Sequence, residues 1–265
     1  MNNQNIQTDF NMGLNSNILH SEHFQRSNKY DTMWIFKNQM GPNPLWLTEF
    51  LTQPFDLKPG MRVLDLGCGK GMTSVFLARE FGVQVYAVQS WDPPDDIWNN
   101  AKEYGVENLI IPIQADARKL PFAKGFFDAV LCVDAYMYFG ADDFYLDYII
   151  QFLRSSGRIG MVGPCMMKDF TNGIPEHLTY FWAPECWSYH TLQWWRYLWG
   201  RTGLVSIDAA DNLQDGCALW LRWNEALQST GNARDYAQEI AHDIEAFKND
   251  KGEYIGFVRL IATKK

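Results

Sequence analysis

Residues 61–71, Met-Arg-Val-Leu-Asp-Leu-Gly-Cys-Gly-Lys-Gly, decide the fold of this chain. The run from Val63 to Leu66 is apolar except for Asp65 and is long enough for a buried strand. Three glycines then arrive at alternate positions, and a helical pattern begins at Met72. Strand, glycine loop and helix in this order predict the opening of a nucleotide-binding α/β unit, because glycine lets a ligand approach bare backbone and a helix N-terminus offers unpaired N–H groups.

The glycine spacing indicates which nucleotide binds. A dinucleotide fingerprint, G-x-G-x-x-G, would need its third glycine at position 72, where the chain has methionine. An acid two residues before G-x-G-x-G instead resembles the first motif of the class I S-adenosylmethionine-dependent methyltransferases. The resemblance implies that S-adenosylmethionine is the cofactor. It also implies that the cofactor contacts Asp65, Gly67, Cys68, Gly69 and Gly71.

A second apolar run, Val83 to Val88, predicts the next strand. In the resembled family an acid at the end of this strand binds the ribose hydroxyls, whereas this chain has Gln89. Glutamine keeps an acceptor oxygen but carries no charge. We expect Gln89 and Ser90 to face the cofactor. Trp91 either covers a ring of the cofactor or packs within its loop.

The third predicted strand, 109–113, leads into Asp116-Ala117 and then Leu120-Pro121-Phe122. The resemblance implies that Asp116 binds the exocyclic amine of adenine and that the Ala117 N–H binds a ring nitrogen.

The fourth predicted strand, Phe127 to Val133, is nearly all apolar and therefore central. Asp134 follows it directly, at the edge where ligands of open α/β sheets bind. We expect Asp134 to contact the cofactor and, with Tyr138, to lie where methyl donor meets acceptor. His190 is a third candidate catalytic residue, although a histidine among aromatic residues packs more often than it catalyses.

The whole pattern predicts an α/β fold, a Rossmann-like, seven-stranded, mostly parallel sheet with helices on both faces and a helical cap. Leu146, Ile149, Ile150 and Leu153 share one face of a helix predicted after the fourth strand. The resemblance implies that the closing strand, 254–262, enters antiparallel between strands five and six.

The chain divides into an N-terminal tail and helical lid, 1–55, and a cofactor-binding domain, 56–265. Tyr30 in the lid is expected to contact the cofactor. An aromatic-rich insertion at about 165–200 is expected to cap the site. Within this insertion we expect Trp194, Trp195 and Trp199 to pack against the core.

Composition limits the function further. The net charge is −8 and the pI is about 5.1, which argues against sequence-independent nucleic-acid binding. No apolar run reaches the roughly 18 residues of a spanning helix. The five cysteines are scattered without C-x-x-C pairs, which predicts reduced thiols, a cytoplasmic location, and neither structural zinc nor another metal. The chain is compatible with a homodimer.

We therefore expect methyl transfer to a small organic or amphipathic acceptor. Two alternatives remain at this stage. A catalytically silent S-adenosylmethionine-binding protein is favoured by Gln89. A nicotinamide-dependent oxidoreductase is disfavoured by Met72 and by Asp116-Ala117.

Overall fold

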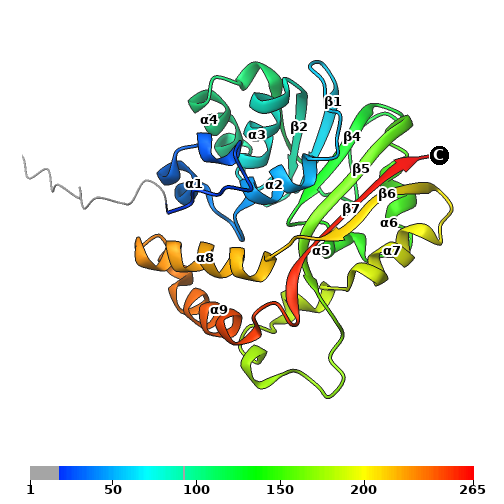
Figure 1. Ribbon diagram of the computed structural model, residues 1–265. Helices are drawn as coiled ribbons and strands as arrows, with labels where there is room; N and C mark the ends of the chain where they lie inside the picture. Colours follow the sequence, from blue (N-terminus) through cyan, green and yellow to red (C-terminus); the bar gives the residue numbers. More distant parts are fainter. Residues whose placement is uncertain (1–17, 92) are drawn as a thin grey trace, which may run out of the picture.

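The computed structural model describes residues 18–91 and 93–265, and a seven-stranded sheet forms its centre (Figure 1). The strand order is β3-β2-β1-β4-β5-β7-β6. Strands β1 to β5 pair in parallel, whereas β7 is antiparallel to both β5 and β6. This confirms the expected sheet and the position of its closing strand. The strands are β1 Arg62–Leu66, β2 Gln84–Gln89, β3 Ile110–Gln114, β4 Phe127–Val133, β5 Leu153–Met166, β6 Val205–Asn212 and β7 Ile255–Lys264.

Helices cover both faces of the sheet (Figure 1). On one face α2 packs against α3, β4 and β5, and α3 packs against α4 and β2. On the other face α6 contacts β5, and α7 contacts β6 and β7. None of the described helices is long and apolar enough to cross a membrane. The helices are α1 Thr32–Asn38, α2 Pro44–Thr52, α3 Met72–Phe81, α4 Asp95–Glu103, α5 Met137–Gly140, α6 Tyr145–Ile150, α7 Leu192–Gly200, α8 Gly216–Ser229 and α9 Ala237–Asp250.

Local sequence fixes where the first helices begin and end. Asp31 caps α1 by accepting a hydrogen bond from the Trp34 N–H, and Asn43 caps α2 immediately before Pro44. Helix α3 starts after Gly71 and stops at Gly82, which has the left-handed conformation typical of a helix C-terminus. The lid and the glycine loop are therefore joined to the sheet by well-capped helices.

The helix expected through Leu153 is shorter than predicted. Helix α6 ends at Ile150, and Leu153 opens strand β5. Leu153 is fully buried, as the helical periodicity implied, but it pairs with Phe127 as a strand residue. The prediction was wrong because a buried strand residue can fall by chance on the i+7 position of a preceding helix.

Helices α8 and α9 form a hairpin inserted between β6 and β7, and they pack against each other. Strand β6 ends at Asn212 and β7 begins at Ile255, which pairs with Met166 at the carboxyl end of β5. The hairpin therefore emerges at the carboxyl edge of the parallel strands, where Figure 1 shows it beyond the sheet. Helix α7 lies on the sheet instead, with Trp195 and Trp199 buried against Tyr136 as expected.

Candidate functional site

Four neighbouring parallel strands deliver the predicted site residues to one edge of the sheet. Strand β1 leads into the glycine loop, and β2 ends at Gln89, which pairs with Gln114 at the end of β3. Strand β4 lies on the other side of β1 and leads into Asp134. Because the carboxyl ends of parallel strands meet at one edge, the structure brings together residues from four separate motifs.

The glycine loop has a conformation that favours glycine at all three alternate positions. Gly67, Gly69 and Gly71 have φ values of 79°, 53° and 85°. A Cβ atom on Gly67 would lie 2.5 Å from Ala135 Cβ, and one on Gly69 would lie 2.9 Å from Met40 Sδ. Bare backbone at this loop is therefore a steric requirement.

Asp65 braces the loop from inside the protein. Its side chain is buried, and Oδ2 accepts hydrogen bonds from the Thr73 and Ser74 hydroxyls at the start of α3. Burial raises its pKa to about 6. No described residue donates to Oδ1. Burial also raises the pKa of Cys68, so this thiol is not an activated nucleophile.

Gln89 organises the turn after β2. It is buried, and its Oε1 accepts a 2.8 Å hydrogen bond from the Trp91 N–H. Ser90 is exposed, and 83% of the Trp91 surface is open to solvent. Trp91 therefore does not pack within its loop, and its ring is accessible to a ligand.

Asp116 is exposed at the end of the neighbouring strand. Its Oδ1 accepts a 2.8 Å hydrogen bond from the Arg118 N–H, while no described residue donates to Oδ2. The Tyr145 hydroxyl donates to the Ala117 carbonyl, which fixes this turn from α6. One carboxylate oxygen of Asp116 is thus available at the edge.

Asp134 is the most unusual carboxyl group of the site. Its backbone is left-handed, with φ of 54°, and its side chain is mostly buried with no hydrogen-bond donor among the described residues. Burial raises its pKa to about 8. Two tyrosines, Tyr138 of α5 and Tyr189, lie near enough to sense its charge. Burial and the Asp134 charge together raise the pKa of Tyr138 to about 12.

His190 lies next to this group in the chain but is held by stacking. Its ring lies 3.6 Å from the Trp194 ring centroid, nearly parallel to it. Burial lowers its pKa, opposed by Asp169. His190 is therefore neutral at pH 7, and the structure shows no hydrogen bond from it to Asp134 or Tyr138.

Tyr30 does not reach the glycine loop. Its ring is buried and packs on Trp34, Phe76 and Tyr104, with the Arg79 guanidinium above it. Arg79 lies in the last turn of α3, about 10 Å along the helix from the loop at 1.5 Å per residue. The structure places the Tyr30 ring in the packing between the lid and α3, and its expected cofactor contact stays a prediction.

Sequence reasoning missed the part of the lid that does reach the loop. Met40 lies over Gly69, and Gly41 lies against the Asp134 carboxyl group. Tyr189 was also missed as a site residue. The sequence signals that could have identified these residues were a glycine beside a methionine after α1 and a tyrosine in an aromatic-rich segment. Neither pattern is specific to a binding site.

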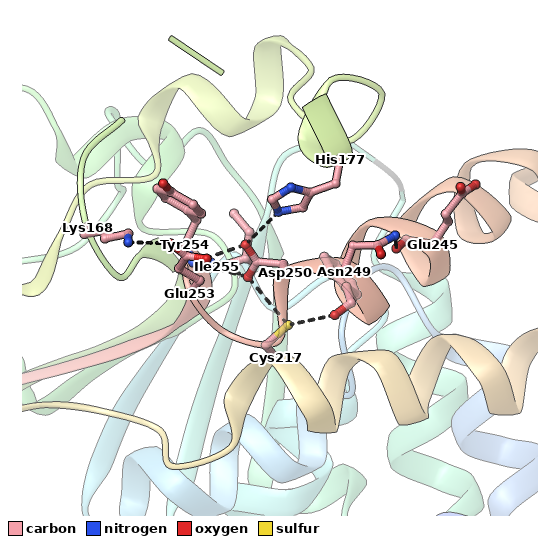
Figure 2. Close-up of polar contacts among 10 residues, drawn as sticks. Lys168, His177, Cys217, Glu245, Asn249, Asp250, Glu253, Tyr254 and Ile255 are labelled. Carbon is pink, nitrogen blue, oxygen red and sulfur yellow. Dashed lines mark hydrogen bonds and ion pairs between the residues drawn. The ribbon is translucent and has the colours of Figure 1, made fainter. Parts of the chain in front are cut away.

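The segment that carries Tyr189, residues 167–191, is fastened to the α8–α9 hairpin by a buried carboxylate (Figure 2). Asp250 Oδ1 lies 3.2 Å from His177 Nε2, and Oδ2 accepts a hydrogen bond from the Ile255 N–H at 3.0 Å. The Cys217 thiol is a longer contact at 3.9 Å. Within 18–91 and 93–265 no group of His, Cys, Asp or Glu side chains could hold a metal ion.

Comparison with known proteins agrees with this arrangement. Residues 63–157 match the family model of a methyltransferase domain. The chain is 28% identical over 116 residues to methyltransferase GfsG of Streptomyces halstedii, covering 43% of this chain and 42% of the relative. It is 29% identical over 119 residues to the sarcosine/dimethylglycine N-methyltransferase of Halorhodospira halochloris, covering 44% and 43%.

The fold is similar to that of a solved structure, geranyl diphosphate C-methyltransferase from Streptomyces coelicolor in complex with S-adenosyl-L-homocysteine. The TM-score is 0.64 at 20% identity, over 82% of this chain and 76% of the other. The chain spans less than half the length of the first curated relatives that it matches.

Proposed function

We propose that the chain is a class I S-adenosylmethionine-dependent methyltransferase and that it transfers a methyl group from S-adenosylmethionine to a small organic acceptor. The observation that carries the proposal is the convergence of the glycine loop, Gln89, Asp116 and Asp134 on one edge of the sheet.

The residues at this edge suit the cofactor. The glycine loop offers backbone without side chains of its own, and its three glycines lie against Ala135, Met40 and Ile97. Asp116 offers a carboxylate oxygen that could accept a hydrogen bond from the adenine amine. Gln89 stands where the ribose is expected, and Trp91 offers an exposed ring nearby. These contacts are proposals that rest on the positions of the residues and on the family motif.

The acceptor side is proposed to lie at Asp134, Tyr138 and Tyr189. The bound cofactor supplies a methyl group on a positively charged sulfur, and the acceptor atom must approach opposite that sulfur. The protein contributes position, alignment and exclusion of water. Asp134 in its ionised form is the group best placed to take a proton from the acceptor, because a pKa raised to about 8 by burial makes that form a stronger base than an ordinary carboxylate.

Among acceptors, the carboxyl groups of Asp134 and Glu185 favour a basic amine, because a bound ammonium group favours the ionised form of Asp134. Asp134 and Glu185 form no ion pair with any described residue, and both lie near Tyr138. Tyr138 and Trp187 are exposed rings on two elements that touch, α5 and the short helix Pro184–Ser188. Carboxylates combined with aromatic faces suit ammonium groups. The Arg118 guanidinium donates a 3.2 Å hydrogen bond to the Tyr138 carbonyl.

The experiment incubates the protein with methyl-labelled S-adenosylmethionine and matched panels of amines, phenols and carboxylic acids. Gly67→Val, which places a side chain against Ala135, serves as the site-blocked control. Labelled amine from the wild type alone supports the proposal. Labelled phenol or carboxylate would correct the acceptor class but keep methyl transfer. Cofactor binding without any product would contradict methyl transfer and favour a silent cofactor-binding protein.

A further inference from the structure

Residues 39–42 form the part of the lid that touches the cofactor site, and we call them the lid turn. Met40 Sδ lies over Gly69 of the glycine loop, and the Cα of Gly41 faces the Asp134 carboxyl group. The lid turn therefore lies between the glycine loop and Asp134. A ligand on the loop could neither enter nor leave past this position without displacing the lid turn.

A tryptophan on a distant helix holds the lid turn in place. Trp223 of α8 is buried, and its Nε1 donates a 2.8 Å hydrogen bond to the Gly41 carbonyl oxygen. The same ring packs on Phe36 of α1, with centroids 5.6 Å apart. The next residue, Arg222, donates a 2.8 Å hydrogen bond to the Ile18 carbonyl. Helix α8 thus fastens the lid at its start and at its turn.

Helix α1, which directly precedes the lid turn, is fastened to the glycine loop through Asn100. Asn100 of α4 accepts a hydrogen bond from the Trp34 indole N–H at 2.9 Å and donates to Asn38 Oδ1 at 2.9 Å. It also donates a 2.8 Å hydrogen bond to the Lys70 carbonyl. Helix α1 is held from this side through Asn100, whereas the bond from Trp223 to Gly41 is the only hydrogen bond that the described residues make to the lid turn.

The α8–α9 hairpin also contacts the acceptor side. Phe181 packs edge-on against Trp220 of α8 and Phe247 of α9. Asp250 binds His177 (Figure 2). Both Phe181 and His177 belong to the segment that carries Tyr189. One hairpin therefore supports the lid turn over the donor and the segment beside the acceptor.

We propose that Trp223 is a positioning residue that holds the lid turn closed and thereby slows the exchange of cofactor and demethylated product. The proposal rests on the function proposed above. Helix α8 lies outside every cofactor motif, and the proposal is that its Trp223 side chain sets how long the ligand stays bound. The test must therefore measure the rate of ligand release and not the rate of methyl transfer.

The test measures dissociation of S-adenosylhomocysteine by stopped flow for the wild type and for W223F. Phenylalanine keeps an aromatic ring but loses the N–H that binds Gly41. The matched control is W220F, because Trp220 lies on the same helix, is also buried, and donates its indole N–H to no described residue. Dissociation is expected to be about fivefold faster for W223F, the scale of one lost hydrogen bond, and unchanged for W220F.

Hydrogen exchange with S-adenosylhomocysteine bound gives a second readout. The amides of residues 39–42 should exchange faster in W223F than in the other two proteins. Equal dissociation rates for wild type and W223F, or equal acceleration in W220F, would overturn the role of Trp223 alone. Failure of the wild type to bind S-adenosylhomocysteine at all would overturn the proposed function, and this inference with it.

Discussion

The Cα atom of Gly41 faces the carboxyl group of Asp134 without room for a side chain between them, because a methyl group at residue 41 would overlap Asp134 Oδ2. The lid turn and the end of β4 are therefore packed to contact, although 93 positions separate the two residues. This contact places a lid residue between the proposed donor and acceptor sides.

Gly41→Ala should push the lid turn away from Asp134 and weaken S-adenosylhomocysteine binding about tenfold, or about 1.4 kcal/mol. Calorimetry measures the affinity. Gly200→Ala is the control, because a Cβ there would make only an ordinary 3.7 Å contact with Ile207. Equal affinity for Gly41→Ala and the wild type would show that the lid turn does not bear on the ligand.

Asp116→Ala should weaken cofactor binding by about 1–3 kcal/mol, the scale for losing a hydrogen bond to a charged group. Asp116→Asn keeps an acceptor oxygen and should lose less. An S-adenosylhomocysteine analogue with inosine in place of adenosine lacks the amine. It should therefore bind to Asp116→Ala almost as tightly as S-adenosylhomocysteine binds to that variant. A full additional loss with that analogue would place the adenine elsewhere.

Gln89→Glu should tighten cofactor binding by up to tenfold. Glutamate keeps the acceptor that binds the Trp91 N–H, and charge-assisted hydrogen bonds are about twice as strong as neutral ones. Gln89→Met, of similar length but apolar, should weaken binding instead. Titration with S-adenosylhomocysteine measures both. Tenfold weaker binding by Gln89→Glu would reveal another anion nearby and reject the ribose assignment.

Asp134→Asn should gain stability relative to the wild type as the pH rises. Burial raises the pKa of Asp134 from 3.8 to about 8, so between these values the folded chain holds a proton that the unfolded chain has lost. The free energy of unfolding that Asp134 contributes therefore falls as the pH rises through this window. From pH 5 to pH 8 the variant should gain up to about 4 kcal/mol over the wild type in denaturant titrations, because each unit of pKa difference corresponds to about 1.36 kcal/mol. A pH-independent difference would contradict the burial of an unpaired carboxyl group.

The edge proposed to bind the cofactor could be assembled from the sequence because its determinants are local. Asp65, the glycine loop and the start of α3 lie within ten positions, and Asp116 and Asp134 directly follow their strands or turns. Parallel pairing then brings their ends together without further information. The departure at Gln89 was visible for the same reason.

The lid could not be predicted because its determinants are long-range. Trp223 and Gly41 are 182 positions apart, and a tryptophan in a helical pattern reads as an ordinary core residue. Tyr30 is expected to contact the cofactor because it lies in the lid. In the structure its ring is buried against Phe76 of α3. Only the packing of α8 on α1 distinguishes the residues that reach the site.

Calorimetry with the unmodified protein tests most directly whether the glycine-loop edge binds S-adenosylmethionine. We expect one molecule of S-adenosylhomocysteine to bind to each chain and NADH not to bind, because residue 72 is methionine where a dinucleotide site needs its third glycine. Binding of NADH, or no binding of S-adenosylhomocysteine, would contradict it.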